Sequence, residues 1–270
     1  MKPIQKIEKS QFNAANRENI LSINVRIDGF SFIISNKESI IVGEKYEWQA
    51  KDWLFAYNKI KDILNLQKKF DNSFLKVICI IHSCDSCLIP DEFYSKDQEK
   101  FALETYLGKS DLKVLSTKLR LLSAHFIFGI YPAIYSLFIN KFPNIITYNK
   151  SAFDIDMALK EADEKSTLII EIVKQEFEII AIKSKELIAH NFFQFQTADE
   201  FMFLLLSFVK QNDFDTEKLE LKIKGNLLMD SKIGVKLDKY FRNIHFKKPT
   251  SDKKEDAFNS LLNYTQIANN

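Results

Sequence analysis

Glycine and proline are both scarce in this chain, which has 6 glycines and 5 prolines in 270 residues. A loop that wraps its backbone N–H groups around a phosphate needs glycines, because other side chains keep the backbone away from the ligand. The sequence therefore limits phosphate-binding loops to very few places. It is rich instead in hydrophobic residues, 46% of the total with 24 phenylalanines, which is enough to fill the cores of two lobes.

The chain also lacks a charge imbalance and a disulfide framework. Lys and Arg number 38 against 36 Asp and Glu, with no long block of one sign, so nucleic acid is not an expected partner. The three cysteines lie between Cys79 and Cys87, and their odd number predicts free thiols. The N-terminal segment lacks the apolar core of a secretory signal. The missing signal and the free thiols together predict a cytoplasmic protein.

One uncharged stretch, residues 121–140, has the length of a membrane span. Ser123 and His125 reduce its hydrophobicity, and Pro132 is well placed for the first turn of a helix. The favoured interpretation is a buried strand followed by a core helix, with a membrane span as the alternative. We therefore predict no integral membrane span.

Residues 21–35 contain two runs in which apolar and polar side chains alternate, which is typical of a β-hairpin. A two-residue primed turn at Asp28-Gly29 would pair Ile27 with Phe30 and place every apolar side chain on one face. A third strand, an amphipathic helix and an apolar strand are expected to follow, at residues 39–48, 52–67 and 75–81.

The second half of the chain repeats this order, with the hairpin about 30 residues before its helix in both halves. That helix begins after Thr197, which forms a capping box with Glu200. The repetition predicts an α/β fold of duplicated ribonuclease-H-like lobes, with mixed sheets and helices. The lobes are expected at residues 1–150, with an insertion at about 90–122, and at 151–249, followed by a weakly ordered tail at 250–270.

A resemblance to a known family is carried by six segments, in the order LSINVRIDGFSFII, CLIPDEFY, ETYL, NFFQFQTADEFMFLLL, LKIKGNL and LDKYFRNIHF. They are similar to an uncharacterised Bacteroidota family, the domain of unknown function 3822, over roughly residues 20–247. Members of that family are described as actin-like, so the resemblance implies the actin-like ATPase fold, to which paired ribonuclease-H-like lobes belong. It implies no activity, because none of the segments is a catalytic motif.

Actin-like ATPases hold phosphates and a metal between two hairpin turns, each with an Asp followed by glycines. The first turn here offers Asp28 and Gly29, which a plain hairpin turn also needs, whereas the second, residues 173–176, has neither residue type. The glycine pair of the adenosine-binding segment is reduced to Gly225. We predict no bound cofactor. The alternative is ATP with magnesium at Asp28, Gly29 and Gly225.

A second group of candidate ligands consists of Cys79, His82, Cys84 and Cys87, which would suit zinc. If residues 79–82 are extended, Cys79 and His82 point to opposite faces of the strand and do not converge on one ion. The pattern favours thiols that finish a core strand and enter a loop. No metal site is predicted, and no catalytic residue, since neither G-x-S-x-G nor H-E-x-x-H occurs.

These observations predict a catalytically inactive actin-like protein that binds or scaffolds protein partners. The inter-lobe cleft and the insertion after Pro90 are the expected binding surfaces. Two alternatives stand beside it: a degenerate actin-like ATP-binding protein or ATPase, and a peripheral component of a membrane-associated assembly. No motif identifies the protein partner.

Overall fold

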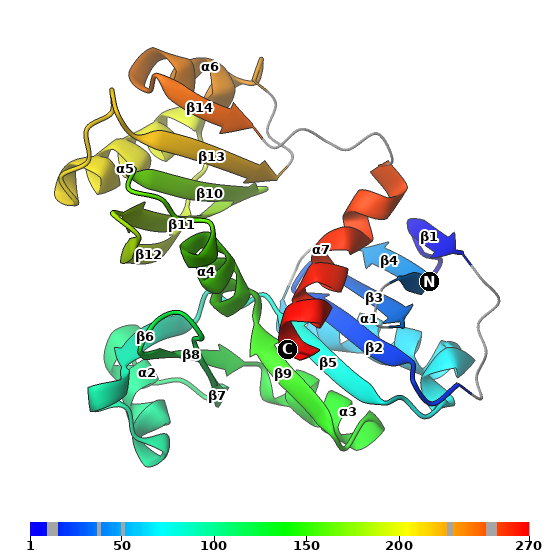
Figure 1. Ribbon diagram of the computed structural model, residues 1–270. Coiled ribbons are helices and arrows are strands. Elements are labelled where there is room, and N and C mark those ends of the chain that lie inside the picture. The colour runs from blue at the N-terminus through cyan, green and yellow to red at the C-terminus, as the bar shows by residue number, and fades with distance from the viewer. Residues whose placement is uncertain (10–15, 37–38, 50–51, 226–228, 247–252, 270) are drawn as a thin grey trace. The chain divides into compact units, whose positions relative to one another are not determined.

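The computed structural model describes residues 1–9, 16–36, 39–49, 52–225, 229–246 and 253–269 (Figure 1). The chain divides into two compact units: Met1–Phe153 together with Pro249–Asn270, and Asp154–Lys248. We refer to them as the first and the second unit. The boundary falls inside helix α4 (Lys150–Lys160), which contributes residues to both.

The first unit is built on a six-stranded sheet with the strand order β1-β4-β3-β2-β5-β9. β2, β3 and β4 are antiparallel neighbours, whereas β5 runs parallel to β2 and β9 runs parallel to β5. The strands are β1 (Gln5–Glu8), β2 (Ile20–Arg26), β3 (Gly29–Ser35), β4 (Ile40–Glu47), β5 (Lys76–Ile81) and β9 (Ile145–Asn149).

The second unit repeats this arrangement in a five-stranded sheet with the order β12-β11-β10-β13-β14. Strand for strand, this is the order β4-β3-β2-β5-β9 of the first unit, with the same antiparallel and parallel pairings. The predicted pair of ribonuclease-H-like lobes is therefore confirmed. The strands are β10 (Thr167–Val173), β11 (Glu176–Lys183), β12 (Glu186–Gln194), β13 (Glu220–Gly225) and β14 (Asn243–Phe246).

Two helices fill the core on one face of each sheet. They are α1 (Trp53–Leu66) and α3 (Pro132–Lys141) in the first unit, and α5 (Ala198–Gln211) and α6 (Lys232–Tyr240) in the second. The predicted N-cap starts α5: the Thr197 hydroxyl accepts the N–H of Glu200 at 3.1 Å. The Glu200 carboxylate accepts the N–H of Gln196, one residue before the cap, at 2.8 Å, where a capping box would use the N–H of Thr197.

The first hairpin differs from the sequence-based expectation in its register. Val25 pairs with Phe30, so the two turn residues are Ile27 and Asp28, whereas the prediction was Asp28 and Gly29. Neither Ile27 nor Asp28 has a positive φ, and the turn is therefore not of the primed type. The register is displaced by two residues, and the apolar side chains keep their face because the period of a strand is two.

An insertion separates β5 from α3 in the first unit. It is a three-stranded sheet with the order β6-β8-β7, accompanied by helix α2 (Glu99–Leu107). It begins and ends outside the predicted residues 90–122, because its central strand is β8. The strands are β6 (Ser86–Pro90), β7 (Lys113–Lys118) and β8 (Ala124–Ile130).

The uncharged stretch at residues 121–140 forms strand β8 and helix α3, and Pro132 is the first residue of that helix. The predicted combination of a buried strand and a following helix is confirmed. Within the described ranges, no helix combines the length and the apolar composition that crossing a bilayer requires.

The C-terminal segment corrects the expectation of a weakly ordered tail. Helix α7 (Lys253–Asn269) belongs to the first unit and packs on its sheet. The hydroxyl of Thr265 donates to that of Ser22 on β2 at 2.6 Å. Residues 250–252 lie outside the described part of the chain. Among residues 258–269 of α7, the buried apolar side chains are Phe258, Leu261, Tyr264 and Ala268.

Candidate functional site

Asp28 in the first hairpin turn and Gly29, the first residue of β3, are two of the three residues that the nucleotide alternative needs. Asp28 is buried, and its carboxylate forms an ion pair with Arg26, with Nε 2.8 Å from Oδ1 and Nη2 3.3 Å from Oδ2. Gly29 lies so close to β4 that a Cβ there would be 3.0 Å from the carbonyl oxygen of Tyr46. Both residues therefore have structural roles within the first unit.

The second hairpin turn lies where the sequence predicts it. Val173 pairs with Glu176, and Lys174 and Gln175 form the two-residue loop between them. Lys174 has a φ of 57°, a left-handed conformation that glycine adopts without strain and other residues adopt at a cost. The turn keeps the backbone shape of a tight loop, but it presents side chains where a phosphate-binding loop has glycines.

Gly225, the third residue of the nucleotide alternative, ends β13 with a φ of +99°. It pairs with Ile172 on β10, and a Cβ at this position would lie only 2.3 Å from the carbonyl oxygen of Ile172. Any side chain would collide with that strand. The close approach of β10 and β13 thus accounts for this glycine without a ligand.

The structure does not gather the four candidate zinc ligands into one group. Cys79 is buried in β5, Cys84 is exposed, and Cys87 is half-buried in β6. The His82 ring contacts the side-chain oxygen of Asn24 at 2.8 Å. Burial raises the pKa of the Cys79 and Cys87 thiols, which disfavours the thiolate form that binds metals.

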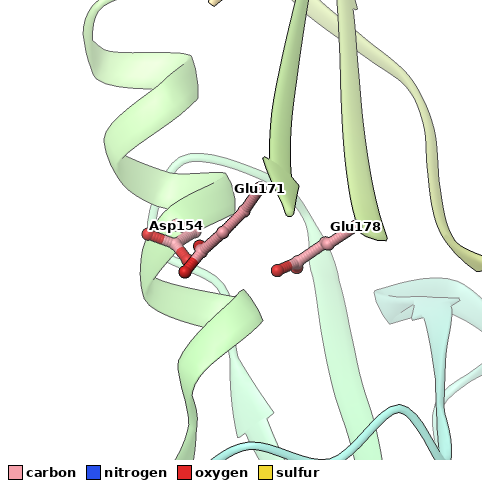
Figure 2. Close-up of side chains that lie close together, drawn as sticks. All are labelled: Asp154, Glu171 and Glu178. Atoms are coloured by element: carbon pink, nitrogen blue, oxygen red, sulfur yellow. The ribbon is translucent and has the colours of Figure 1, made fainter. Parts of the chain in front are cut away.

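Three carboxylates from three elements of the second unit do come together: Asp154 on α4, Glu171 on β10 and Glu178 on β11 (Figure 2). One carboxylate oxygen of each lies within 4.8 Å of the other two. Glu171 and Glu178 are direct cross-strand neighbours, and the side chains of Asp154 and Glu178 are buried. We call these three residues the carboxylate cluster.

Two basic side chains border the carboxylate cluster. Lys224 on β13 is the cross-strand neighbour of Glu171 on β10. Its Nζ atom lies 3.5 Å from Oδ1 of Asp154. Nε2 of His190 lies 2.8 Å from Glu178. Like charges that face each other across strands destabilise a sheet. The ammonium group of Lys224 offsets part of the repulsion among the carboxylates, and the His190 ring shares a hydrogen bond with Glu178.

The carboxylate cluster and Lys224 line a shallow recess that has no room for a water molecule between their side chains. Carboxylate oxygens are ligands that hard divalent cations prefer, and an ammonium group can replace part of such a cation's charge. In this arrangement one ammonium group, that of Lys224, lies next to three carboxylates and compensates part of their charge.

Sequence reasoning did not find the carboxylate cluster, although part of the signal is present. Glu171 and Glu178 stand at equal distances from the turn formed by Lys174 and Gln175, so their pairing follows from the hairpin. Asp154 is contributed by a helix that precedes the hairpin, and no spacing in the sequence relates it to the two glutamates.

Comparison with protein families gives one match that spans most of the chain. The model described as "Protein of unknown function (DUF3822)" matches residues 9–244. No curated protein matches. The family model and the six sequence segments therefore point to the same family.

The solved structures that share the fold over nearly the whole chain include the following two. One is a Bacteroides thetaiotaomicron protein with an actin-like ATPase fold and unknown function, at 20% identity and a TM-score of 0.82, covering 94% of this chain and 99% of that one. The other is the PilM-PilN type IV pilus biogenesis complex, at 10% identity and a TM-score of 0.58, covering 93% and 99%. At these identities the likeness shows the actin-like fold alone.

Proposed function

We propose that this chain, which belongs to the DUF3822 family and has an actin-like fold, is a catalytically inactive binding or scaffolding protein that acts through protein partners. The observation that carries the proposal is the second hairpin turn, where Lys174 and Gln175 stand in place of the glycines of a phosphate-binding loop. The structural roles of Asp28, Gly29 and Gly225 support it.

A bound triphosphate requires specific protein groups around it. Its several negative charges need ordered backbone N–H donors from both hairpin turns, a cation, and carboxylates that hold the cation. In this chain the Asp28 carboxylate already pairs with Arg26, and the flexible ammonium of Lys174 does not replace a row of amides. Losing several charge-assisted hydrogen bonds, each worth about 1.5–3 kcal/mol, moves a micromolar site beyond the millimolar range.

Calorimetry with ATP and magnesium tests the nucleotide arm of the proposal. We expect no binding heat for the wild type. A dissociation constant in the low micromolar range that is abolished by Asp28→Ala, with the variant still folded, would contradict the proposal and establish the ATP-binding alternative. The matched control is Arg26→Ala, which removes the same ion pair without removing the carboxylate that a magnesium site would need.

The insertion exposes three large aromatic side chains, and each is a candidate for contact with a partner. Phe93, Phe101 and Tyr106 are 72%, 70% and 65% exposed, and large aromatic side chains at such exposure are typical anchors of protein interfaces. We call these three residues the aromatic surface. It supports the expectation that the insertion after Pro90 contacts a partner.

Co-purification with the tagged full-length chain tests the aromatic surface. Proteins retained by the wild type should be lost with the double variant Phe93→Ser/Phe101→Ser. Phe203→Ser is the matched control, because Phe203 is 69% exposed but lies on α5 of the second unit. Retention of the same proteins by the double variant would contradict a role for the aromatic surface.

A second candidate function is a peripheral role in a membrane-associated assembly. It is favoured by the PilM-PilN complex, a structure of the same fold that works in type IV pilus biogenesis. Cell fractionation tests this second candidate. A peripheral component of a membrane-associated assembly should sediment with membranes and be released by alkaline carbonate.

A further inference from the structure

The two units treat the same sheet edge differently. In the first unit β4 is covered by β1, an added antiparallel strand in which Gln5 pairs with Lys45 and Ile7 with Gly43. In the second unit β12 occupies the position of β4, yet it is the last strand of its sheet as far as the chain is described (Figure 1). The duplication therefore shows what an occupied edge of this kind looks like.

The backbone polarity of β12 follows from one hydrogen bond. The N–H of Phe195 donates to the carbonyl of Gln175 at 2.9 Å, just as the N–H of Trp48 donates to the carbonyl of Asp28 at 3.0 Å in the first unit. Antiparallel strands bond to one neighbour at every second residue, so Phe192 and Gln194 direct their backbone N–H and C=O groups away from β11. Counted from these bonds, Phe192 is the counterpart of Lys45, which pairs with β1.

A groove of about 390 Å³ adjoins the end of this edge. Its charged lining is acidic: Glu176 accepts a hydrogen bond from the Gln194 side chain at 3.2 Å, and Glu200 accepts one from the backbone N–H of Gln196 at 2.8 Å. The lining residues are Gln175, Glu176, Gln194, Phe195, Gln196 and Glu200.

We propose that the outer edge of β12 binds an extended segment of a partner protein as an additional strand, with basic side chains of that segment directed to the groove. Main-chain hydrogen bonds at Phe192 and Gln194 supply the affinity, as in other cases of strand addition. The acidic lining selects a segment with lysine or arginine, because carboxylates attract cationic side chains. This inference rests on the proposed function as a protein-binding module, and it adds a second surface to the aromatic surface.

The probe is a synthetic peptide with the sequence of residues 1–9, MKPIQKIEK, which contains the strand that covers the equivalent edge of the first unit. Amide hydrogen exchange of the full-length protein is measured with and without about 1 mM peptide, a concentration suited to a weak site. We expect exchange at Phe192 and Gln194 to slow by about fivefold or more. A peptide with its three lysines replaced by glutamate should give no protection.

Two variants separate strand addition from side-chain binding. Gln194→Pro removes an outward N–H and leaves the bonds to β11 in place, so it should abolish the protection. Gln194→Ala loses the same side-chain contact with Glu176 but keeps the N–H, so it should retain the protection.

Unchanged exchange in the wild type, or equal protection by both peptides, would overturn the inference. The peptide comparison on the wild type stands even if Gln194→Pro fails to fold. A negative result with the peptides would overturn strand addition at β12 but not the proposed function. The proposed function is tested separately, by the ATP titration and by the variants of the aromatic surface.

Discussion

At the scale of single residues, the clearest constraint is the glycine at position 225. Gly225→Ala combines a positive φ with a Cβ 2.3 Å from the carbonyl oxygen of Ile172, so β10 and β13 must separate. We expect a loss of about 3 kcal/mol or more in the free energy of unfolding. Gly108→Ala is the control, because Gly108 has a φ of +85° but no atom within 4 Å of the added Cβ. Urea denaturation measures both losses. An equal loss of unfolding free energy in Gly225→Ala and Gly108→Ala would show that the positive φ, and not the collision with β10, causes the effect.

Asp91, which follows β6 in the insertion, makes the free energy of unfolding depend on pH in the acid range. The hydrogen bond from Lys118, aided by the nearby His125, lowers the pKa of Asp91 below its usual 3.8. A lowered carboxylate pKa adds stability that is present above 3.8 and is lost as the pH falls through the folded-state pKa. Urea denaturation should therefore find Asp91→Asn less stable than the wild type at pH 7 and equally stable well below 3.8. The exposed neighbour variant Glu92→Gln should show no such difference.

The three thiols should react with Ellman's reagent in three distinct phases. Cys84 is exposed and reacts first, whereas burial raises the pKa of Cys87 and slows it. Cys79 is buried and its raised pKa leaves almost no thiolate, so it should react only after unfolding. Cys84→Ser should remove the fast phase. Elemental analysis showing about one zinc per chain, with all three thiols protected, would contradict this assignment.

At the scale of elements, helix α7 is integral to the first unit. Phe258 is fully buried on the sheet, where its ring would come within 3.1 Å of a Cβ placed on Gly43. Phe258→Ala should therefore lower the free energy of unfolding by about 3–5 kcal/mol. The exposed neighbour variant Asn259→Ala should change it by less than about 0.5 kcal/mol. A Phe258→Ala protein with the thermal midpoint of the wild type would show that α7 contributes little.

At the scale of the whole molecule, the two units differ in how their sequence is distributed. The second unit is one continuous segment, whereas the first is completed by residues 249–270 from the other end of the chain. A fragment of residues 150–248 should unfold cooperatively by itself. A fragment of residues 1–160 should expose the face that α7 covers and become insoluble, and a synthetic peptide of residues 249–270 should restore its solubility. Equal solubility of the fragment with and without the peptide would contradict this view.

The sequence by itself determined the order of elements and the faces of the strands. Alternation with a period of two separated core from surface in the hairpins, and the N-cap at Thr197 located the start of α5. The duplication of the strand order followed from these local signals.

Tertiary structure decided those features for which the local sequence pattern allows more than one arrangement. A slip of two residues preserves every face, so the register at Asp28 was settled by packing against β4. The pattern of α7 is too weak to hold a helix in water, and burial on the sheet makes it one. The carboxylate cluster depends on Asp154 reaching the hairpin from α4. Contacts between segments far apart in the chain leave no periodic trace in the sequence, which is why only the folded chain reveals them.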